Sequence, residues 1–384
     1  LMDMEDNVCP SFGACPSMGT ANTMQMLGEV LNLVLPGTST IPASDNAKLR
    51  KAREAGMYMV EMAKAGRKPS DLITKEVLMN AIMFDMAVAG STNAVLHILS
   101  YAYELGIKLT LEDFEKYAEE IPCINAIVPS GPYTVVDFHY AGGVMNVMKM
   151  LESKLYTNVP SMYGNTWADM LSKVKAQENK VIHSLEKPLF HEPGLKILRG
   201  NLSPNGAIVR PTAVYDEVKY MKGKAKVFEG DRPAFEAIMA GEIVPGDIIV
   251  IRYEGCKGAP GMKELMLSID ALIGLGLDKS VGLISDARFS GFNYGAIIGH
   301  VSPEAYDGGN IALVENGDEI VIDIPNGEVS MLVSEEELER RRAAWVCPPL
   351  KEEKGCLNIF AKMCRPAEEG GAMQPWDLNA KFKR

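Results

Sequence analysis

Histidine, tryptophan and cysteine are scarce in this 384-residue sequence, which contains five histidines, three tryptophans and seven cysteines. Seven cysteines in so long a chain are too sparse for a secreted disulfide scaffold, and their spacings are not those of a structural zinc site. Five histidines also argue against a histidine-rich metal centre. Apolar runs such as 30–35 are far shorter than the roughly 20 residues that a membrane-spanning helix needs.

Positive charge is also in short supply. The chain has 39 Lys and Arg against 50 Asp and Glu, a net charge of −11, and no basic cluster. Because phosphate binding needs clustered Lys and Arg, we expect no nucleic-acid partner. The first residues, Leu-Met-Asp-Met, lack a cationic segment followed by an apolar one, so we expect no secretory signal. The sequence therefore predicts a cytoplasmic protein that does not enter a membrane.

The chain is long enough for two or three domains, and its 47% hydrophobic and 23% charged residues are typical of globular proteins. Apolar residues recur at helical spacing in the first half. The predicted helices cover 21–35, 48–65, 75–88 behind Thr74 as N-cap, 92–105, and 110–121.

After about residue 186 the pattern changes to β-branched runs bounded by Gly, Pro and Asp. These predicted strands cover 207–209, 243–253, 281–285, 319–324 and 328–333, the last two joined by an Asn-Gly turn into a hairpin. Ser334 and Glu337 form a capping box for a charged helix. We predict a helix-rich domain over 1–185, a barrel-like or sandwich-like domain over 186–365, and a tail over 366–384.

Four short stretches are rich in residues that a protein core does not need. The first, 13–23, places Cys15 among glycines before a predicted helix, where the helix dipole favours a thiolate; a free cysteine at a packed turn is the alternative. The second, 252–264, follows a buried strand and contains three glycines and a proline. It offers Glu254 and Glu264 either as oxygen ligands for a hard metal ion or as solvated loop carboxylates.

The third stretch, 284–291, leads from a predicted strand through Arg288 to Ser290 and a glycine. Such a serine is often a nucleophile or a base, yet the stretch has no Gly-x-Ser-x-Gly elbow and the sequence supports no His-paired triad. Arg288 could pair with a carboxylate or form a structural salt bridge. The fourth stretch, 299–305, is equally compatible with a packed turn. Spacing alone assigns no reaction to these four stretches.

Longer motifs run through the same stretches. They are Gly-Ala-Cys-x-x-Met-Gly-Thr-Ala-Asn-Thr-Met at 13–24, Leu-Pro-Gly-x-x-x-Ile-Pro-Ala at 35–43, Gly-Ser-Thr-Asn-Ala-Val-Leu-His at 90–97, Pro-Ser-Gly-x-Tyr at 129–133, Arg-Tyr-Glu-Gly-x-Lys-Gly-x-Pro-Gly-Met at 252–262, Asp-x-Arg-Phe-Ser-Gly at 286–291 and Gly-His-Val-Ser-Pro-Glu-Ala at 299–305. Together, from about residue 9 to 345, they resemble the dihydroxy-acid and sugar-acid (aldonate) dehydratase family, often called IlvD/Edd.

The resemblance implies an α/β fold, with a helix-rich α/β domain, a smaller β-barrel-like domain and the active site between them, usually in a homodimer. It also implies a hydro-lyase that converts a 2,3-dihydroxy acid into a 2-oxo acid with an iron–sulfur cluster, [2Fe-2S] or [4Fe-4S], and Mg²⁺. By position, Cys15 matches the last of three cluster cysteines, Glu264 the magnesium-binding glutamate, and Ser290 the proposed base. Arg288 would help to bind substrate. Cys256 stands where many relatives have proline, a difference that we interpret as incidental.

The start of the chain departs from the family pattern. The family's other two cluster cysteines, its magnesium aspartates and its modified lysine lie upstream of the motif around Cys15, where this sequence has only fourteen residues. We therefore expect the chain as given to lack a complete cluster. Three functions remain open: a branched-chain dihydroxy-acid dehydratase, a sugar-acid dehydratase, and a catalytically incomplete binding or assembly remnant. The residues at 18–21 are somewhat more typical of the sugar-acid members of the family.

Overall fold

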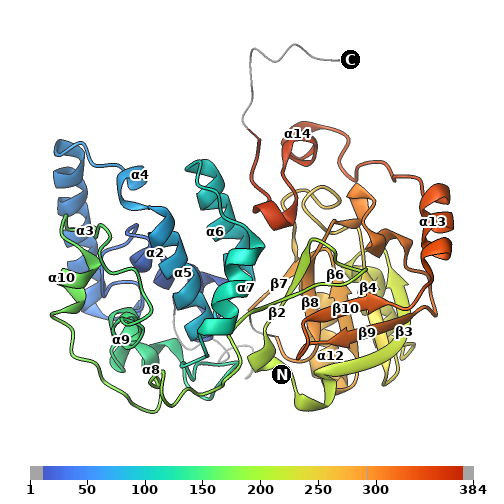
Figure 1. The fold of residues 1–384 in the computed structure, drawn as a ribbon, viewed down its shortest axis with the longest axis horizontal. Helices are drawn as coiled ribbons and strands as arrows, with labels where there is room; N and C mark the ends of the chain where they lie inside the picture. The colour runs from blue at the N-terminus through green and yellow to red at the C-terminus, as the bar shows by residue number, and fades with distance from the viewer. Residues whose placement is uncertain (1–11, 292, 375–384) are drawn as a thin grey trace, which may run out of the picture.

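The computed structural model describes residues 12–291 and 293–374. Cys9 therefore lies outside the described residues. Helices occupy the first half of the chain and strands the second, and the two halves lie side by side (Figure 1). The helices of the first half are α2 (Thr20–Val30), α3 (Asn46–Lys64), α4 (Pro69–Leu72), α5 (Lys75–Val88), α6 (Asn93–Glu104), α7 (Leu111–Glu120), α8 (Val135–Tyr140), α9 (Gly143–Met150) and α10 (Trp167–Leu171).

Helix α5 forms the centre of the helical half. Nearly every residue from Val77 to Val88 is buried, which explains why its sequence is apolar on all sides rather than on one stripe. The Thr74 hydroxyl accepts a hydrogen bond from the Val77 amide, as the predicted N-cap requires. Helices α2, α6 and α7 pack around α5 and complete one hydrophobic core.

Helix α2 is shorter than predicted. It ends at Val30 because Asn32 takes a left-handed backbone conformation (φ 60°). The segment that follows turns back onto the buried Glu29, whose carboxylate accepts hydrogen bonds from the amides of 37–39. The apolar residues at 31–35 thus continue the helical pattern without continuing the helix.

The second half is built on an eight-stranded sheet in the order β1-β2-β8-β6-β4-β3-β9-β10. Its strands are β1 (Lys196–Leu198), β2 (Gly206–Val209), β3 (Tyr220–Phe228), β4 (Asp247–Ile251), β6 (Gly282–Ser285), β8 (Ile297–Ser302), β9 (Glu319–Asp323) and β10 (Glu328–Met331). A bridge between Arg199, directly after β1, and Glu328 of β10 brings the two edges together. The sheet is therefore a nearly closed barrel around a hydrophobic core, and the predicted barrel-like domain is confirmed.

Several predicted elements of this half are also confirmed. Strands β9 and β10 form the expected antiparallel hairpin, and Ser334 caps helix α13 (Glu335–Ala344) by accepting from the Glu337 amide. Strand β4 is shorter than the predicted 243–253, because 243–246 form a turn before the parallel pairing with β3 begins. Helices α11 (Asp231–Met239) and α12 (Leu267–Gly274) cover the outside of the sheet over a second core.

The last described residues return to the helical half. Helix α14 (Gly355–Met363) and the 3₁₀ turn η6 (Ala367–Glu369) lie over the barrel next to α6 (Figure 1). A Cβ on Gly370 would lie 2.6 Å from the Ser100 amide nitrogen of α6, so this contact is close. Among the residues that the structure describes, no helix is both long and apolar enough to span a membrane.

Candidate active site between the two halves

The loop that carries Cys15 runs directly into α2. The Asn22 side-chain amide donates to the carbonyls of Cys15 (2.6 Å) and Ser17 (2.7 Å), which folds the loop back onto the first turn of the helix. The Cys15 thiol is exposed, and its Sγ lies 3.3 Å from the Ser17 Oγ. A thiol at this position is open to a ligand from outside the loop.

The loop that carries Ser290 packs against the Cys15 loop. A Cβ on Gly291 would lie 2.9 Å from the Gly19 Cα and 2.7 Å from the Met18 carbonyl oxygen, so only glycine permits this approach. A Cβ on Gly19 would in turn lie 3.8 Å from the Cys15 Sγ. Residues far apart in sequence, Cys15 and half-buried Ser290, are thus brought to one junction between the halves.

Glu264 and Arg288 are neighbours because two short strands pair in parallel. In β5 (Glu264–Leu265) and β7 (Arg288–Phe289), Glu264 is directly opposite Arg288. The Arg288 Nη1 lies 3.5 Å from the Glu264 Oε1, and the Arg288 Nε donates to the Met262 carbonyl. The structure therefore places the predicted metal ligand and the predicted substrate-binding arginine together.

Asn93 links these groups to the helical half, and the sequence analysis did not single it out. Its side-chain nitrogen lies 2.6 Å from the Glu264 Oε1, 2.8 Å from the Thr20 Oγ1 and 3.3 Å from the Phe289 carbonyl oxygen. Asn93 is fully buried at the start of α6. The polar Gly-Ser-Thr-Asn sequence before an apolar helix was the signal that could have identified it.

The alternative carboxylate, Glu254, has a different environment. It is 2% exposed and is paired with Lys263 (3.2 Å) and Lys351 (3.1 Å). Its backbone amide donates to Asp286. Glu254 is thus neither a solvated loop carboxylate nor a neighbour of Asn93, and its surroundings are those of a buried ion pair.

Asp286 and Glu304 support the loops around the junction. Asp286 accepts from the amides of Tyr253 (3.1 Å), Glu254 (3.0 Å) and Ala305 (2.9 Å). Burial raises the pKa of Asp286 to about 6, although these three hydrogen bonds oppose the shift. Burial, followed by the charge of Asp286, raises the pKa of Glu304 to about 8.

Two histidines lie near Arg288. Burial, with smaller contributions from the charges of Arg288 and His97, lowers the pKa of His300 to about 3, and burial also lowers the pKa of His97. The imidazole of His300 is therefore neutral at physiological pH. The stretch 299–305 is more than a packed turn, because His300 belongs to β8, a strand between β2 and β6.

The fit of a metal group can be judged from the donors at the junction. Cys15 supplies one accessible thiol and Glu264 one carboxylate, the ligand types that an iron–sulfur cluster and Mg²⁺ use. Within 12–291 and 293–374, no three His, Cys, Asp or Glu side chains converge as a metal site would require. These residues therefore fit as one ligand each and do not complete either site.

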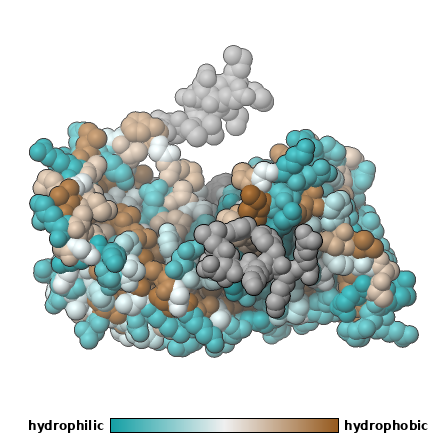
Figure 2. All heavy atoms as spheres, turned by 90° about the horizontal axis from the view of Figure 1, so that it is seen from above, coloured by the Kyte–Doolittle hydropathy of each residue, from teal (hydrophilic) through white to brown (hydrophobic). Residues whose placement is uncertain are grey.

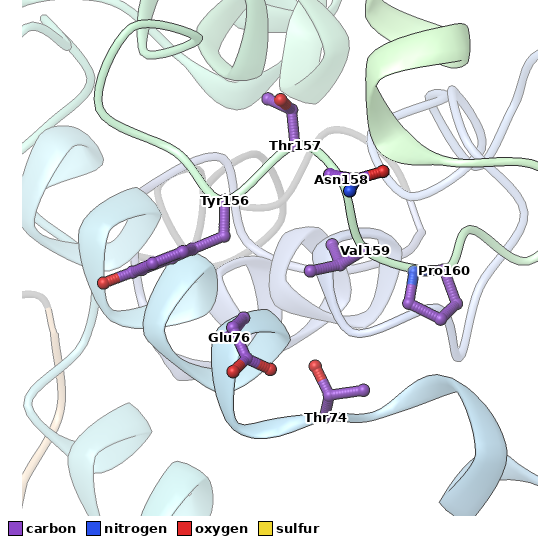
Figure 3. Close-up of a pocket in the computed structure, with 7 residues that line it drawn as sticks. All are labelled: Thr74, Glu76, Tyr156, Thr157, Asn158, Val159 and Pro160. Atoms are coloured by element: carbon purple, nitrogen blue, oxygen red, sulfur yellow. The ribbon is translucent and has the colours of Figure 1, made fainter.

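A pocket of about 490 Å³ lies elsewhere in the helical half (Figure 3). Thr74, Glu76 and Tyr156 line it at the start of α5, whereas the Gly90 loop follows the end of that helix. A helix of 14 residues is about 21 Å long, so this pocket is separate from the junction. It contains none of the predicted site residues.

The fold and the junction define a class: a two-part α/β protein with potential metal ligands, an arginine and a serine where the parts meet. The chain belongs to the dihydroxy-acid/6-phosphogluconate dehydratase family, since the family's N-terminal model matches residues 1–170 and its C-terminal model matches 180–371. The second match extends beyond residue 345, the end of the region in which the sequence was found to resemble the family, and includes α14 and η6.

Curated relatives named dihydroxy-acid dehydratase support this membership. The one from Clostridium novyi is 44% identical over 377 residues, which cover 97% of this chain and 68% of the relative. The one from Ignicoccus hospitalis is 44% identical over 376 residues, with the same two shares. The one from Methanococcus aeolicus is 41% identical over 375 residues, again covering 97% of this chain and 68% of the relative.

Proposed function

We propose that this chain removes water from a 2,3-dihydroxy carboxylic acid and yields a 2-oxo acid, and its relatives are named dihydroxy-acid dehydratase. The observation that supports the proposal most strongly is the junction itself. There the Ser290 loop packs against the Cys15 loop, and Glu264 accepts a hydrogen bond from Asn93 of the helical half.

The reaction breaks two resistant bonds. The proton on C2 is weakly acidic, and hydroxide is a poor leaving group from C3. When bound, an iron–sulfur cluster held partly by Cys15 would supply a Lewis acid for the C3 hydroxyl, and Mg²⁺ held partly by Glu264 would offset negative charge at the carboxylate and C2 hydroxyl.

Ser290 would remove the proton from C2. A serine hydroxyl is a very weak base, so it must act as an alkoxide stabilised by nearby positive charge. Side chains two residues apart along an extended strand point to the same side, so we expect Ser290, directly after β7, to face the same side as Arg288.

Arg288 would orient the substrate carboxylate. Its guanidinium has five N–H donors, of which Nε is used by the Met262 carbonyl, while Nη1 lies near Glu264. The remaining donors form a fork that matches a carboxylate. The substrate carboxylate and Glu264 would then both contact the guanidinium of Arg288.

A panel of substrates tests the proposal. The full-length protein would be reconstituted with iron, sulfide and Mg²⁺ without oxygen, then incubated with 2,3-dihydroxyisovalerate and several aldonates. We expect 2-oxo acid from the branched-chain substrate. Product from aldonates alone would instead support a sugar-acid dehydratase, which the sequence at 18–21 favours. No product from any substrate, with no iron retained, would support the non-catalytic remnant and overturn the proposal.

We further propose a homodimer, as the family resemblance implies, and a location in the cytoplasm, in keeping with the acidic composition of the chain. Light scattering of the purified full-length protein would give the mass of the assembly. A mass of one chain would contradict the dimer.

A further inference from the structure

Arg210 connects three loops at the junction, and the sequence analysis did not single it out. It follows β2 in the strand-rich half and is 2% exposed. Its Nη1 donates to the Gly291 carbonyl at 2.6 Å, and its Nη2 donates to the carbonyls of Met18 (3.1 Å) and Gly90. One guanidinium therefore serves three backbone acceptors.

Each acceptor belongs to a loop that carries a residue of the proposed site. Met18 lies three residues after Cys15, Gly90 lies three residues before Asn93, and Gly291 directly follows Ser290. Met18 and Gly90 belong to the helical half, whereas Arg210 and Gly291 belong to the other half. The hydrogen bonds of Arg210 thus cross between the halves at the place where the site residues meet.

We propose that Arg210 is a positioning residue of the proposed dehydratase, which fixes the Ser290 loop relative to the Cys15 and Asn93 loops. This inference rests on the proposed function. Arginine suits the role because its planar fork reaches several acceptors at once, whereas a lysine ammonium on a flexible stem cannot hold three loops in a fixed geometry.

One fully buried acidic side chain, Asp85, interacts electrostatically with Arg210. A buried charge costs free energy unless it is paired, and burial raises the pKa of Asp85 well above its usual value while the charge of Arg210 opposes that shift. Neither Asp85 oxygen has a hydrogen-bond partner among the described residues. Burial lowers the pKa of Arg210 to about 10, so the guanidinium is still charged at neutral pH.

The test compares the full-length reconstituted wild type with Arg210→Met and Arg210→Lys. Arg341→Met is the matched control, because Arg341 is also largely buried, with the carboxylates of Asp318 and Glu337, away from the three loops. We expect Arg210→Met to lower kcat by about tenfold to a hundredfold at a temperature where it is folded, with KM changed less than about threefold. The kcat of Arg210→Lys should lie between those of the wild type and Arg210→Met, and Arg341→Met should keep the wild-type kcat.

Hydrogen–deuterium exchange supplies a readout that does not need activity. In Arg210→Met, amides in 18–23, 90–94 and 289–291 should exchange faster than in the wild type, while Arg341→Met should leave them unchanged. Unchanged exchange, or a kcat within twofold of the wild type, would overturn the inference. If Arg210→Met fails to fold, Arg210→Lys is judged by the same criteria. A wild type without dehydratase activity would overturn the proposed function, whereas the exchange comparison would still test the role of Arg210.

Discussion

The Asn93 Nδ2 lies 2.6 Å from the Glu264 Oε1, so a hydrogen bond between the two halves ends on the carboxylate that is predicted to bind Mg²⁺. Asn93 is fully buried, and its amide also contacts Thr20 and the Phe289 carbonyl. The orientation of Glu264 therefore depends on the packing of the helical half.

Asn93→Asp should destabilise the junction in a pH-dependent way. The new carboxylate would face Glu264 at hydrogen-bond distance, and two ionised carboxylates repel each other. We expect the free energy of unfolding of the metal-free protein to fall by about 1–3 kcal/mol at pH 8, and by less at pH 5. Denaturant unfolding with a chelator present measures both values.

Asn205→Asp is the matched control for that change. The Asn205 side chain donates to the Glu368 Oε1 at 2.7 Å, but the pair is exposed, so water screens the repulsion. Its loss of stability should be well below that of Asn93→Asp. Equal losses at the two positions would contradict the buried link between the halves.

The extent of cysteine alkylation should differ between the exposed and the buried thiols. Cys15, Cys347 and Cys356 are exposed, whereas burial raises the pKa of Cys123 and of Cys364 to about 12. Iodoacetamide should therefore modify the three exposed thiols of the folded apo-protein, and the buried ones only after unfolding. Mass spectrometry of the peptides gives the extent at each site.

Reconstitution with iron and sulfide should then protect Cys15 alone among these exposed thiols. If Cys15 is a cluster ligand, its thiolate is no longer available to the reagent. Cys347 and Cys356 serve as internal controls within the same sample. Unchanged alkylation of Cys15 in protein that retains iron would contradict its role as a ligand.

Glu304 should make stability depend on pH. Its pKa is raised to about 8, so the folded protein favours the neutral carboxyl. The stability that this group supports is complete below its ordinary pKa of 4.5 and is lost as pH rises through about 8. Glu304→Gln should therefore gain stability relative to the wild type as pH increases, by about 1–3 kcal/mol at pH 9.

Thermal or denaturant unfolding from pH 5 to pH 9 gives this difference directly. Glu353→Gln, an exposed position, is the control and should follow the wild-type curve. A constant difference between Glu304→Gln and the wild type across this range would show that the carboxyl of Glu304 does not titrate as proposed.

The sequence predicted those elements whose signals are local. Thr74 and Ser334 cap helices at the expected residues, and the hairpin of β9 and β10 follows its Asn-Gly turn. Strand β3 was missed, although it lies between β4 and β9, because its Lys, Gly and Tyr residues interrupt the apolar pattern. Its burial depends on neighbours that only the assembled sheet supplies.

The residues of the candidate site also differ in whether a local sequence pattern reveals them. Cys15, Glu264, Arg288 and Ser290 lie in recognisable motifs, and the structure brings their loops to one junction. Arg210 lies in no such motif, and its partners are backbone carbonyls up to 192 residues away in the chain. A role that consists of contacts with distant backbone atoms leaves no local pattern.

Turnover of Ser290→Ala in the reconstituted full-length enzyme tests most directly whether Ser290 removes the C2 proton. We predict a loss of about a hundredfold or more, with iron and magnesium contents equal to those of the wild type. Ser172→Ala, at the exposed end of α10, is the control and should retain full activity. A Ser290→Ala enzyme with normal metal content and near wild-type turnover would contradict the account.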